Sequence, residues 1–268
     1  MGAPFVRPVT VTNDGRQYLA VAAGRRVCRP FHYRWFVPKV VGSKPARWKQ
    51  MTVAAVVTLA ALFVWYAGTV WAAVVPFALA GVMFNVRYPV LVDLPAMVFA
   101  LAAANCAREG WIVPAALLAV VAGMTKETAP LFAALWAWNP IVLVGLAAPA
   151  VRHLFKAGPI VSDDPRAVFA LAHPFRAGRE AHSGRLADWR LWLAPWGPLC
   201  FGFVPASPQT IAVLAAAYGQ CVVATDTVRL YVWAAPVVAA NLFELIPASW
   251  AFLAATAIWF WPWKGDGQ

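Results

Sequence analysis

The sequence predicts an all-α, polytopic helical membrane protein, and three observations support this fold class. Hydrophobic residues make up 62% of the 268 residues and charged residues only 12%, whereas about a quarter of a soluble domain is charged. The apolar runs are long, and residues 51–86 contain no charged side chain. The 15 Trp and 16 Phe suit membrane interfaces, where aromatic rings settle. We expect about eight or nine transmembrane or re-entrant helices, with interfacial helices at the amino terminus.

Charge and hydropathy divide the chain into four regions. These are an interfacial amino-terminal segment with an acidic motif (1–50), transmembrane helices one to five (51–151), a basic polar loop (152–190) and carboxy-terminal transmembrane helices (191–268). The first region holds ten of the 22 Lys and Arg residues, and both basic regions suit contact with anionic lipids. Nucleic-acid binding is not expected, because we identify no folded soluble module that would present the charge.

The amino-terminal region predicts helices that lie on the membrane rather than cross it. Asn13 and Asp14 can cap a short helix that runs through about Ala23 and stops at Gly24. The stretch 29–38 mixes aromatic side chains with cations, which suits a segment in the headgroup layer.

The transmembrane elements follow from the apolar runs. We expect helices at about 50–66, 70–86, 89–107, 111–125 and 128–151, with a tight turn at Gly68–Thr69 and a bend near Asn139–Pro140. Asp164–Pro165 can open an interfacial helix in the polar loop. Residues 191–206 are interrupted by prolines and form either a full crossing or a re-entrant hairpin. Further helices are expected at about 209–224, 226–245 and 248–263.

Three small charged islands interrupt the apolar arms in the middle of the chain. Each arm is near the roughly 17–25 residues that cross a bilayer, so two consecutive arms return the chain to its starting side. The islands at 87–93 and 126–127 should therefore share one side, and the island at 108–109 should lie on the other. Charges at a membrane boundary are costly, which makes these residues candidates for a functional site.

Counting the crossings gives an orientation for the chain. Five crossings separate the amino-terminal region from the basic loop 152–190, so the two lie on opposite faces. We place the loop in the cytoplasm and Asp14, with the islands at 87–93 and 126–127, on the extracytoplasmic side. The expected location is the cell membrane (plasma or inner), with multiple crossings.

Asp14 is the only acid in the first 92 residues. It can cap a helix, and it can also serve as a general base that takes a proton from an acceptor hydroxyl. The four His show no metal-ligand spacing, and the four Cys are expected to be free and buried. No cofactor is otherwise implied, although a divalent metal ion held by Asp14 and Asp93 stays open.

Several motifs share an order along the chain. The segment Asn13-Asp14-Gly-Arg-Gln-Tyr18 is followed by His32-Tyr-Arg34-Trp-Phe-Val-Pro38. Downstream come Tyr88-Pro with Asp93, then Met124-Thr-Lys126-Glu127, and then Thr225-Asp-Thr-Val-Arg229 with Pro236 behind it. Together they resemble the first luminal loop and later signatures of the C-type (GT-C) membrane glycosyltransferases. The chain resembles a reduced form without the first transmembrane helix that usually precedes the acidic loop.

The resemblance implies transfer of a sugar from a polyprenyl-phosphate donor to an acceptor hydroxyl on the extracytoplasmic side, with inversion. Asp14 is then the base, and cations stabilise the anionic leaving group. The residues that would bind substrate are Tyr18, Arg34, Arg87, Asp93, Lys126, Glu127, Asp226 and Arg229. The acceptor, a protein or a glycan, is not specified.

Structural roles compete with these assignments. Lys126 and Glu127 can be a surface pair at a helix start, Arg87 can extend to the interface, and Asp226 with Arg229 can form a pair within one helix. Asp93 is expected to pair with Arg87 or Lys126, or to orient the acceptor.

Two other functions compete with the glycosyltransferase. One is a small transporter or flippase whose buried charges bind a permeating solute, although no convincing internal repeat of the kind common in transporters is visible. The other is a non-catalytic membrane scaffold that binds lipid.

Overall fold

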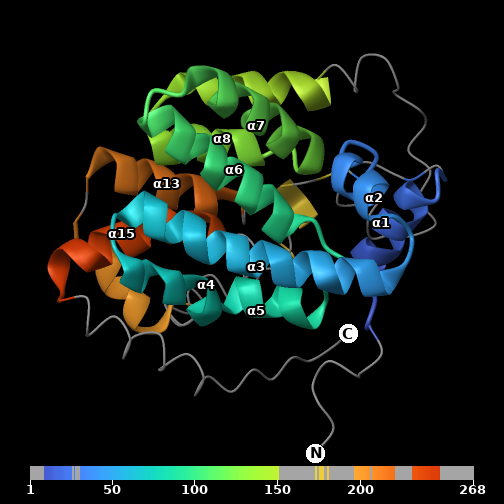
Figure 1. Cartoon of the computed structure of the whole chain (residues 1–268), viewed down its shortest axis with the longest axis horizontal. Helices are drawn as coiled ribbons and strands as arrows, with labels where there is room; N and C mark the ends of the chain where they lie inside the picture. Colours follow the sequence, from blue (N-terminus) through green and yellow to red (C-terminus); the bar gives the residue numbers. More distant parts are fainter. Residues whose placement is uncertain are drawn as a thin grey trace, which may run out of the picture.

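The computed structural model describes residues 9–25, 27, 31–150, 173, 175–177, 180, 196–205, 207–220 and 231–247. Every regular element in these ranges is a helix (Figure 1), which confirms the all-α class. The elements are α1 (Asn13–Ala22), α2 (Phe36–Val41), α3 (Pro45–Ala67), η2 (Val70–Val74), α4 (Val75–Ala78), α5 (Ala80–Arg87), α6 (Asp93–Arg108), α7 (Ile112–Thr125), α8 (Ala129–Ala137), η3 (Pro140–Leu146), η4 (Gly197–Phe203), α13 (Pro208–Gly219), η6 (Val232–Ala234) and α15 (Ala235–Leu245).

Helix α1 lies where the sequence predicts it, but its cap is Thr12. The Thr12 hydroxyl accepts a hydrogen bond from the backbone N–H of Gly15 at 3.1 Å. Asp14 is therefore not the cap but a first-turn acid, a position that suits the helix dipole. Gly24 follows the helix with φ of 79°, a left-handed conformation that glycine adopts at little cost, so the predicted stop is confirmed.

The long helix α3 lies beside α6 across the middle of the molecule (Figure 1). It begins at Pro45, earlier than predicted, because proline fits the first helical turn and the second turn buries Trp48, whose Nε1 donates to Gly42 O at 2.7 Å. It ends at Gly68, where φ is 69°, as predicted. Of the described helices, α3 is the one that is long and apolar enough to cross a membrane by itself.

The single helix predicted for 70–86 is instead broken. Leu79 is extended, with φ of −86° and ψ of 122°, so α4 ends there and α5 begins in a new direction. The segments Val70–Ala78 and Gly81–Arg87 meet at 62°, and together they are long and apolar enough to form a broken span or a re-entrant loop. Apolar composition alone therefore gave the correct helical state but missed the break.

Helices α6 and α7 form a hairpin that matches the predicted pair of apolar arms. Gly110, with φ of 78°, makes the turn between them. We call the end where α6 begins and α7 ends the Asp93 end, and the opposite end the Arg108 end. Asp93 and residues 126–127 lie at the first end and residues 108–109 at the second, in agreement with the predicted hairpin, while the membrane side of each end stays a prediction.

The segment 128–151 is not one straight helix. Trp138 takes a left-handed conformation, with φ of 51°, and the chain reverses at the predicted Asn139–Pro140 bend. A Cβ on Gly145 would lie 2.2 Å from Ala119 O and 2.7 Å from Pro130 Cγ, so η3 returns beside the end of α7 and the start of α8. The region that we expected to be the fifth crossing therefore contains a tight helical reversal.

A separate cluster of apolar side chains joins the amino-terminal helices to the bundle. This amino-terminal cluster comprises Tyr18, Phe31, Val37, Val41, Trp48, Val90, Leu91 and Val92. Gly15 lies so close to the loop before α6 that a Cβ there would be 3.0 Å from Val90 O. The Thr52 hydroxyl donates to Pro89 O at 3.1 Å and holds the same loop against α3. The chain thereby places α1 beside the start of α6.

The carboxy-terminal elements complete the main core. Helix α13 lies within the predicted 209–224 region, and α15 confirms the end predicted near Leu245. Residues 197–203 form the 3-10 helix η4, which packs so closely on α15 that a Cβ on Gly202 would lie 2.0 Å from Val238 O. The expected helix at Asp164–Pro165, most of the loop 152–190, the 226–229 motif and the helix 248–263 lie outside the described residues.

Four exposed tryptophans lie around the Arg108 end. Trp65 and Trp71 flank the end of α3, Trp111 precedes α7, and Trp138 follows α8. Trp65 and Trp111 have ring centroids 5.7 Å apart. This distribution is typical of an aromatic belt at a membrane interface.

Candidate functional site

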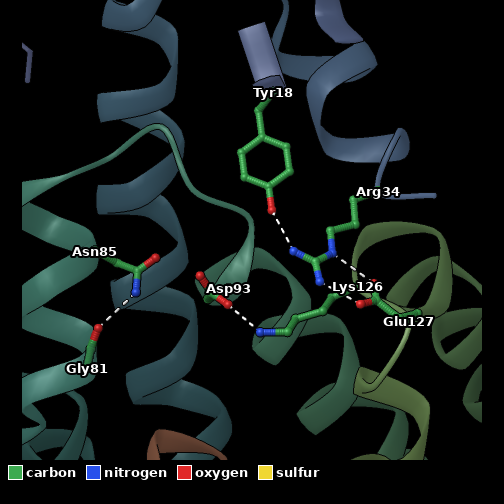
Figure 2. Close-up of polar contacts among 7 residues, drawn as sticks. All are labelled: Tyr18, Arg34, Gly81, Asn85, Asp93, Lys126 and Glu127. Carbon is green, nitrogen blue, oxygen red and sulfur yellow. Dashed lines mark hydrogen bonds and ion pairs between the residues drawn. The ribbon is translucent and has the colours of Figure 1, made fainter. Parts of the chain in front are cut away.

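A buried ion pair marks the Asp93 end. Lys126 Nζ donates to Asp93 Oδ1 at 2.5 Å, and the two side chains are 7% and 1% exposed (Figure 2). Asp93 opens α6 and Lys126 directly follows α7, so the similar lengths of these helices bring the two residues together. Neither charge would be stable alone at this depth. Of the two partners predicted for Asp93, the structure selects Lys126.

A second ion pair lies directly beside the first. Arg34 Nε donates to Glu127 Oε2 at 2.8 Å and Arg34 Nη2 donates to Glu127 Oε1 at 2.5 Å. The third nitrogen, Nη1, donates to the Tyr18 hydroxyl at 3.0 Å (Figure 2). Because Tyr18 is fully buried in the amino-terminal cluster, the guanidinium connects α1 to the α7–α8 loop.

The second pair shifts the ionisation of both its members. Burial alone would lower the pKa of Arg34, but the opposite charge of Glu127 and the hydrogen bonds raise that pKa well above its usual value. Burial alone would raise the pKa of Glu127, but the nearby Arg34 charge and its hydrogen bonds hold that pKa below its usual value. Both groups therefore stay charged at neutral pH.

Asp14 lies one helical turn before Tyr18, on the same side of α1. Its side chain is partly exposed, and the neighbouring Gly15 packs on Val90 in the loop that leads to Asp93. The predicted base thus lies on the helix whose Tyr18 hydroxyl accepts a hydrogen bond from Arg34 of the second ion pair.

The remaining predicted site residues are not part of this cluster. Arg87 is exposed at the end of α5, with its guanidinium carbon 5.5 Å from the centre of the Tyr88 ring. Arg87 was one of two alternative partners predicted for Asp93, and the structure shows the other, Lys126. Asp226 and Arg229 lie outside the described residues.

Two residues of the site were missed by sequence reasoning. Lys126 Nζ lies 5.4 Å from the centre of the Trp233 ring, a cation–π arrangement. Trp233 in turn stacks on Trp136, with ring centroids 5.7 Å apart. The other is Asn85, a buried amide that Figure 2 shows near Asp93. Trp233 lies in an apolar run and carries no signal in the sequence. Asn85 is one of few polar residues in residues 51–86, and a polar side chain in such an apolar run was a detectable signal.

The Arg108 end carries a different set of polar contacts. Arg108 Nη1 donates to Tyr66 O at 2.8 Å, and its guanidinium carbon lies 4.4 Å from the centre of the Tyr66 ring. Trp65 Nε1 donates to Glu109 Oε1 at 3.4 Å. These contacts satisfy the charges of this island locally.

The described part of the chain has no group of three or more His, Cys, Asp or Glu side chains that could hold a metal ion. The arrangement instead offers two paired acids and bases, with a partly exposed carboxylate, Asp14, on the helix that carries Tyr18. Neither the family models, nor the curated proteins, nor the solved structures that we compared with the chain gave a match. A functional assignment must therefore rest on the residues themselves.

Proposed function

We propose that the chain is an integral-membrane glycosyltransferase of the C type, which moves a sugar from a polyprenyl-phosphate donor to an acceptor hydroxyl. The observation that carries the proposal is the convergence at the Asp93 end. Five of the predicted substrate-binding residues, Tyr18, Arg34, Asp93, Lys126 and Glu127, come from distant parts of the sequence and meet there in two adjoining hydrogen-bonded groups.

In the proposed reaction, the Asp14 carboxylate takes the proton of the acceptor hydroxyl. The acceptor oxygen forms a bond to the anomeric carbon, and the bond from that carbon to the phosphate oxygen breaks. Polyprenyl phosphate leaves with the electron pair. Arg34 and Lys126 would stabilise its charge through further N–H groups while they stay paired with Glu127 and Asp93, since a guanidinium has five N–H donors and an ammonium three.

The membrane setting has its own support. Helix α3 is long enough to cross, and exposed apolar side chains follow α7 and η3, among them Val113, Leu117 and Val144. In this proposal the exposed tryptophans of the Arg108 end lie at one interface and the charged Asp93 end lies at the other. We propose a multi-pass protein of about eight or nine transmembrane or re-entrant helices, with the Asp93 end extracytoplasmic and anionic lipids against the basic regions.

The test uses the full chain in lipid nanodiscs. Polyprenyl-phosphate donors that carry radiolabelled neutral pentoses or hexoses are mixed with octyl glycosides as acceptors, and labelled product is counted. Asp14→Asn should abolish transfer while the helical circular dichroism stays the same. Glu244→Gln, which changes an exposed acid on α15, should leave transfer intact. Full transfer by D14N would remove Asp14 as the base, and no transfer by the unaltered chain would refute the proposal.

The broken helix favours a second candidate, a small transporter or flippase. Discontinuous helices frequently form the solute sites of transporters. The 62° break separates α4 from α5, and α5 carries the buried Asn85. Liposomes that contain the protein distinguish the two candidates. Movement of a fluorescent polyprenyl-phosphate lipid between leaflets without sugar transfer would favour the transporter.

A further inference from the structure

Asn85 is a buried amide whose oxygen has no hydrogen-bond partner among the described residues. Its Nδ2 donates to Gly81 O at 2.8 Å. The residue as a whole is only 2% exposed. The contact with Gly81 O fixes which atom is the oxygen, because the flipped amide would bring two acceptors together. A buried acceptor without a donor is costly, so its retention calls for an explanation.

The direction of that oxygen connects it to the buried ion pair. In Figure 2 the Asn85 amide turns its oxygen toward Asp93, which is paired with Lys126. An ionised carboxylate accepts hydrogen bonds but cannot donate them. The Asn85 oxygen and the Asp93 carboxylate are therefore both acceptors, and a hydrogen-bond donor placed between them would stabilise the arrangement.

A complementary donor lies beside Lys126 of the ion pair. Trp233 is fully buried, and its Nε1 has no hydrogen-bond acceptor among the described residues. Its ring covers Lys126 Nζ at 5.4 Å, and its short helix η6 contacts α5, the helix of Asn85. The surroundings of the ion pair thus contain one buried acceptor and one buried donor, on two neighbouring elements.

We propose that Asn85 and Trp233, together with Asp93 and Lys126, form a subsite that binds the hydroxyl groups of a neutral sugar. Hydroxyl groups both donate and accept hydrogen bonds, so the hydroxyls of one sugar can donate to the Asn85 oxygen and accept from the Trp233 N–H. The charges of Asp93 and Lys126 sum to zero, and a charged sugar would leave an unpaired charge at this depth. The subsite rests on the proposed function in that the sugar belongs to the lipid-linked donor.

Binding of simple glycosides tests the subsite separately from transfer. The probes are methyl α-mannopyranoside and methyl α-arabinofuranoside, with the methyl glucuronide as the anionic comparison. Their dissociation constants are measured by titration calorimetry on the full chain in nanodiscs. The neutral glycosides should bind, and the glucuronide should bind at least tenfold more weakly.

Three variants locate the site. Asn85→Leu should weaken binding at least tenfold, or about 1.4 kcal/mol, without lowering the melting temperature, because it also removes the unsatisfied acceptor. Trp233→Phe keeps an aromatic ring and removes the N–H donor, so it should also weaken glycoside binding. This variant tests the subsite even if N85L fails to fold. Asn105→Leu is the matched control, since Asn105 is also 2% exposed but donates to Leu62 O at 3.1 Å toward the other end of α6. It should leave glycoside binding unchanged.

The outcomes separate this inference from the proposed function. Unaltered affinity in N85L and W233F, equal binding of the glucuronide, or no binding by the unaltered chain would overturn the subsite. A loss of stability in N85L with unchanged affinity would indicate a buried water instead and would also overturn it. Glycoside binding without any sugar transfer would support the subsite and refute the transferase. Sugar transfer together with unaltered glycoside binding by N85L would support the transferase and refute the subsite.

Discussion

Arg34 and Glu127 are 93 residues apart in sequence and are joined by two hydrogen bonds. The guanidinium fork matches the carboxylate in a geometry that is both strong and directional. Its third nitrogen reaches Tyr18, so one side chain connects the amino-terminal helices to the α7–α8 loop. The position of Asp14 relative to the remaining charges therefore depends on this contact.

Arg34→Lys should loosen the connection although it keeps the charge, because lysine cannot make the two parallel bonds. We expect a loss of about 2 kcal/mol in the free energy of unfolding, since hydrogen bonds to charged groups are worth roughly 1.5–3 kcal/mol. Denaturant unfolding in detergent measures it. Arg16→Lys, at an exposed position of α1, is the control. Equal stability of both variants would argue against the connection.

The pairing of Asp93 with Lys126 predicts strong coupling between substitutions. Asp93→Leu or Lys126→Met alone strands a buried charge and should cost about 3–5 kcal/mol. The double variant D93L/K126M should cost much less than the sum, because both charges are removed together. A double-mutant cycle by thermal or denaturant unfolding measures the coupling, and strict additivity would contradict the buried pair.

The stability of the protein should depend on pH through Glu127. Its pKa is lowered in the folded state, so the stabilisation is present above the ordinary glutamate pKa of about 4.3 and is lost as pH falls through the lower folded value. The stability difference between the unaltered chain and Glu127→Gln should be constant near neutral pH and shrink below about pH 4. Unfolding between pH 3 and 7 measures it, and a difference that stays the same to pH 3 would contradict the prediction.

The close approach of η3 to α7 predicts that Gly145 tolerates no side chain. A Cβ there would lie 2.2 Å from Ala119 O, so Gly145→Ala should cost about 1–3 kcal/mol through overpacking. Gly219→Ala is the matched control, because its Cβ would meet nothing within 4 Å, and it should be neutral or stabilising. Equal melting temperatures for the two variants would disprove the packing of the reversal.

The orientation of the bundle can be tested with single cysteines. In a chain whose native cysteines are replaced by alanine, R16C reports the Asp93 end and E109C the Arg108 end, both at exposed positions. A membrane-impermeant maleimide should label R16C only from outside intact cells and E109C only after permeabilisation. Labelling of both from one face would contradict the proposed crossing.

Much of this arrangement was accessible from the sequence. The lengths of the two apolar arms predicted that Asp93 and Lys126 share one end, because regular helices convert residue number into distance. Capping signals and glycines located α1 and the turn at Gly68. The break at Leu79 and the packing of η3 on α7 were not predicted. Pro76 was a local signal for an interruption of the 70–86 helix, but the position of the break and the return of η3 depend on packing against other elements.

The site shows the same division between local and long-range information. Motif order led to Tyr18, Arg34, Lys126 and Glu127, but not to which acid meets which base. Arg87 is closer in sequence to Asp93 than Lys126 is, yet it points to Tyr88. Trp233 was not predicted, because an aromatic residue in an apolar run is most often part of the hydrophobic core. Its role here depends on its contact with the Lys126 ammonium group.

The long sequence separation of Arg34 and Glu127 also has a consequence for biosynthesis. At about 5–20 residues per second, Arg34 is made roughly 5–20 seconds before its partner, and α3, α6 and α7 emerge in the interval. Until the ribosome has delivered the α7–α8 loop, the Arg34 guanidinium lacks its carboxylate partner, although the apolar contacts of the amino-terminal helices can already form. Formation of this ion pair is therefore a late event in assembly, and a ribosome stalled before residue 127 would carry a chain in which Arg34 has not yet met Glu127.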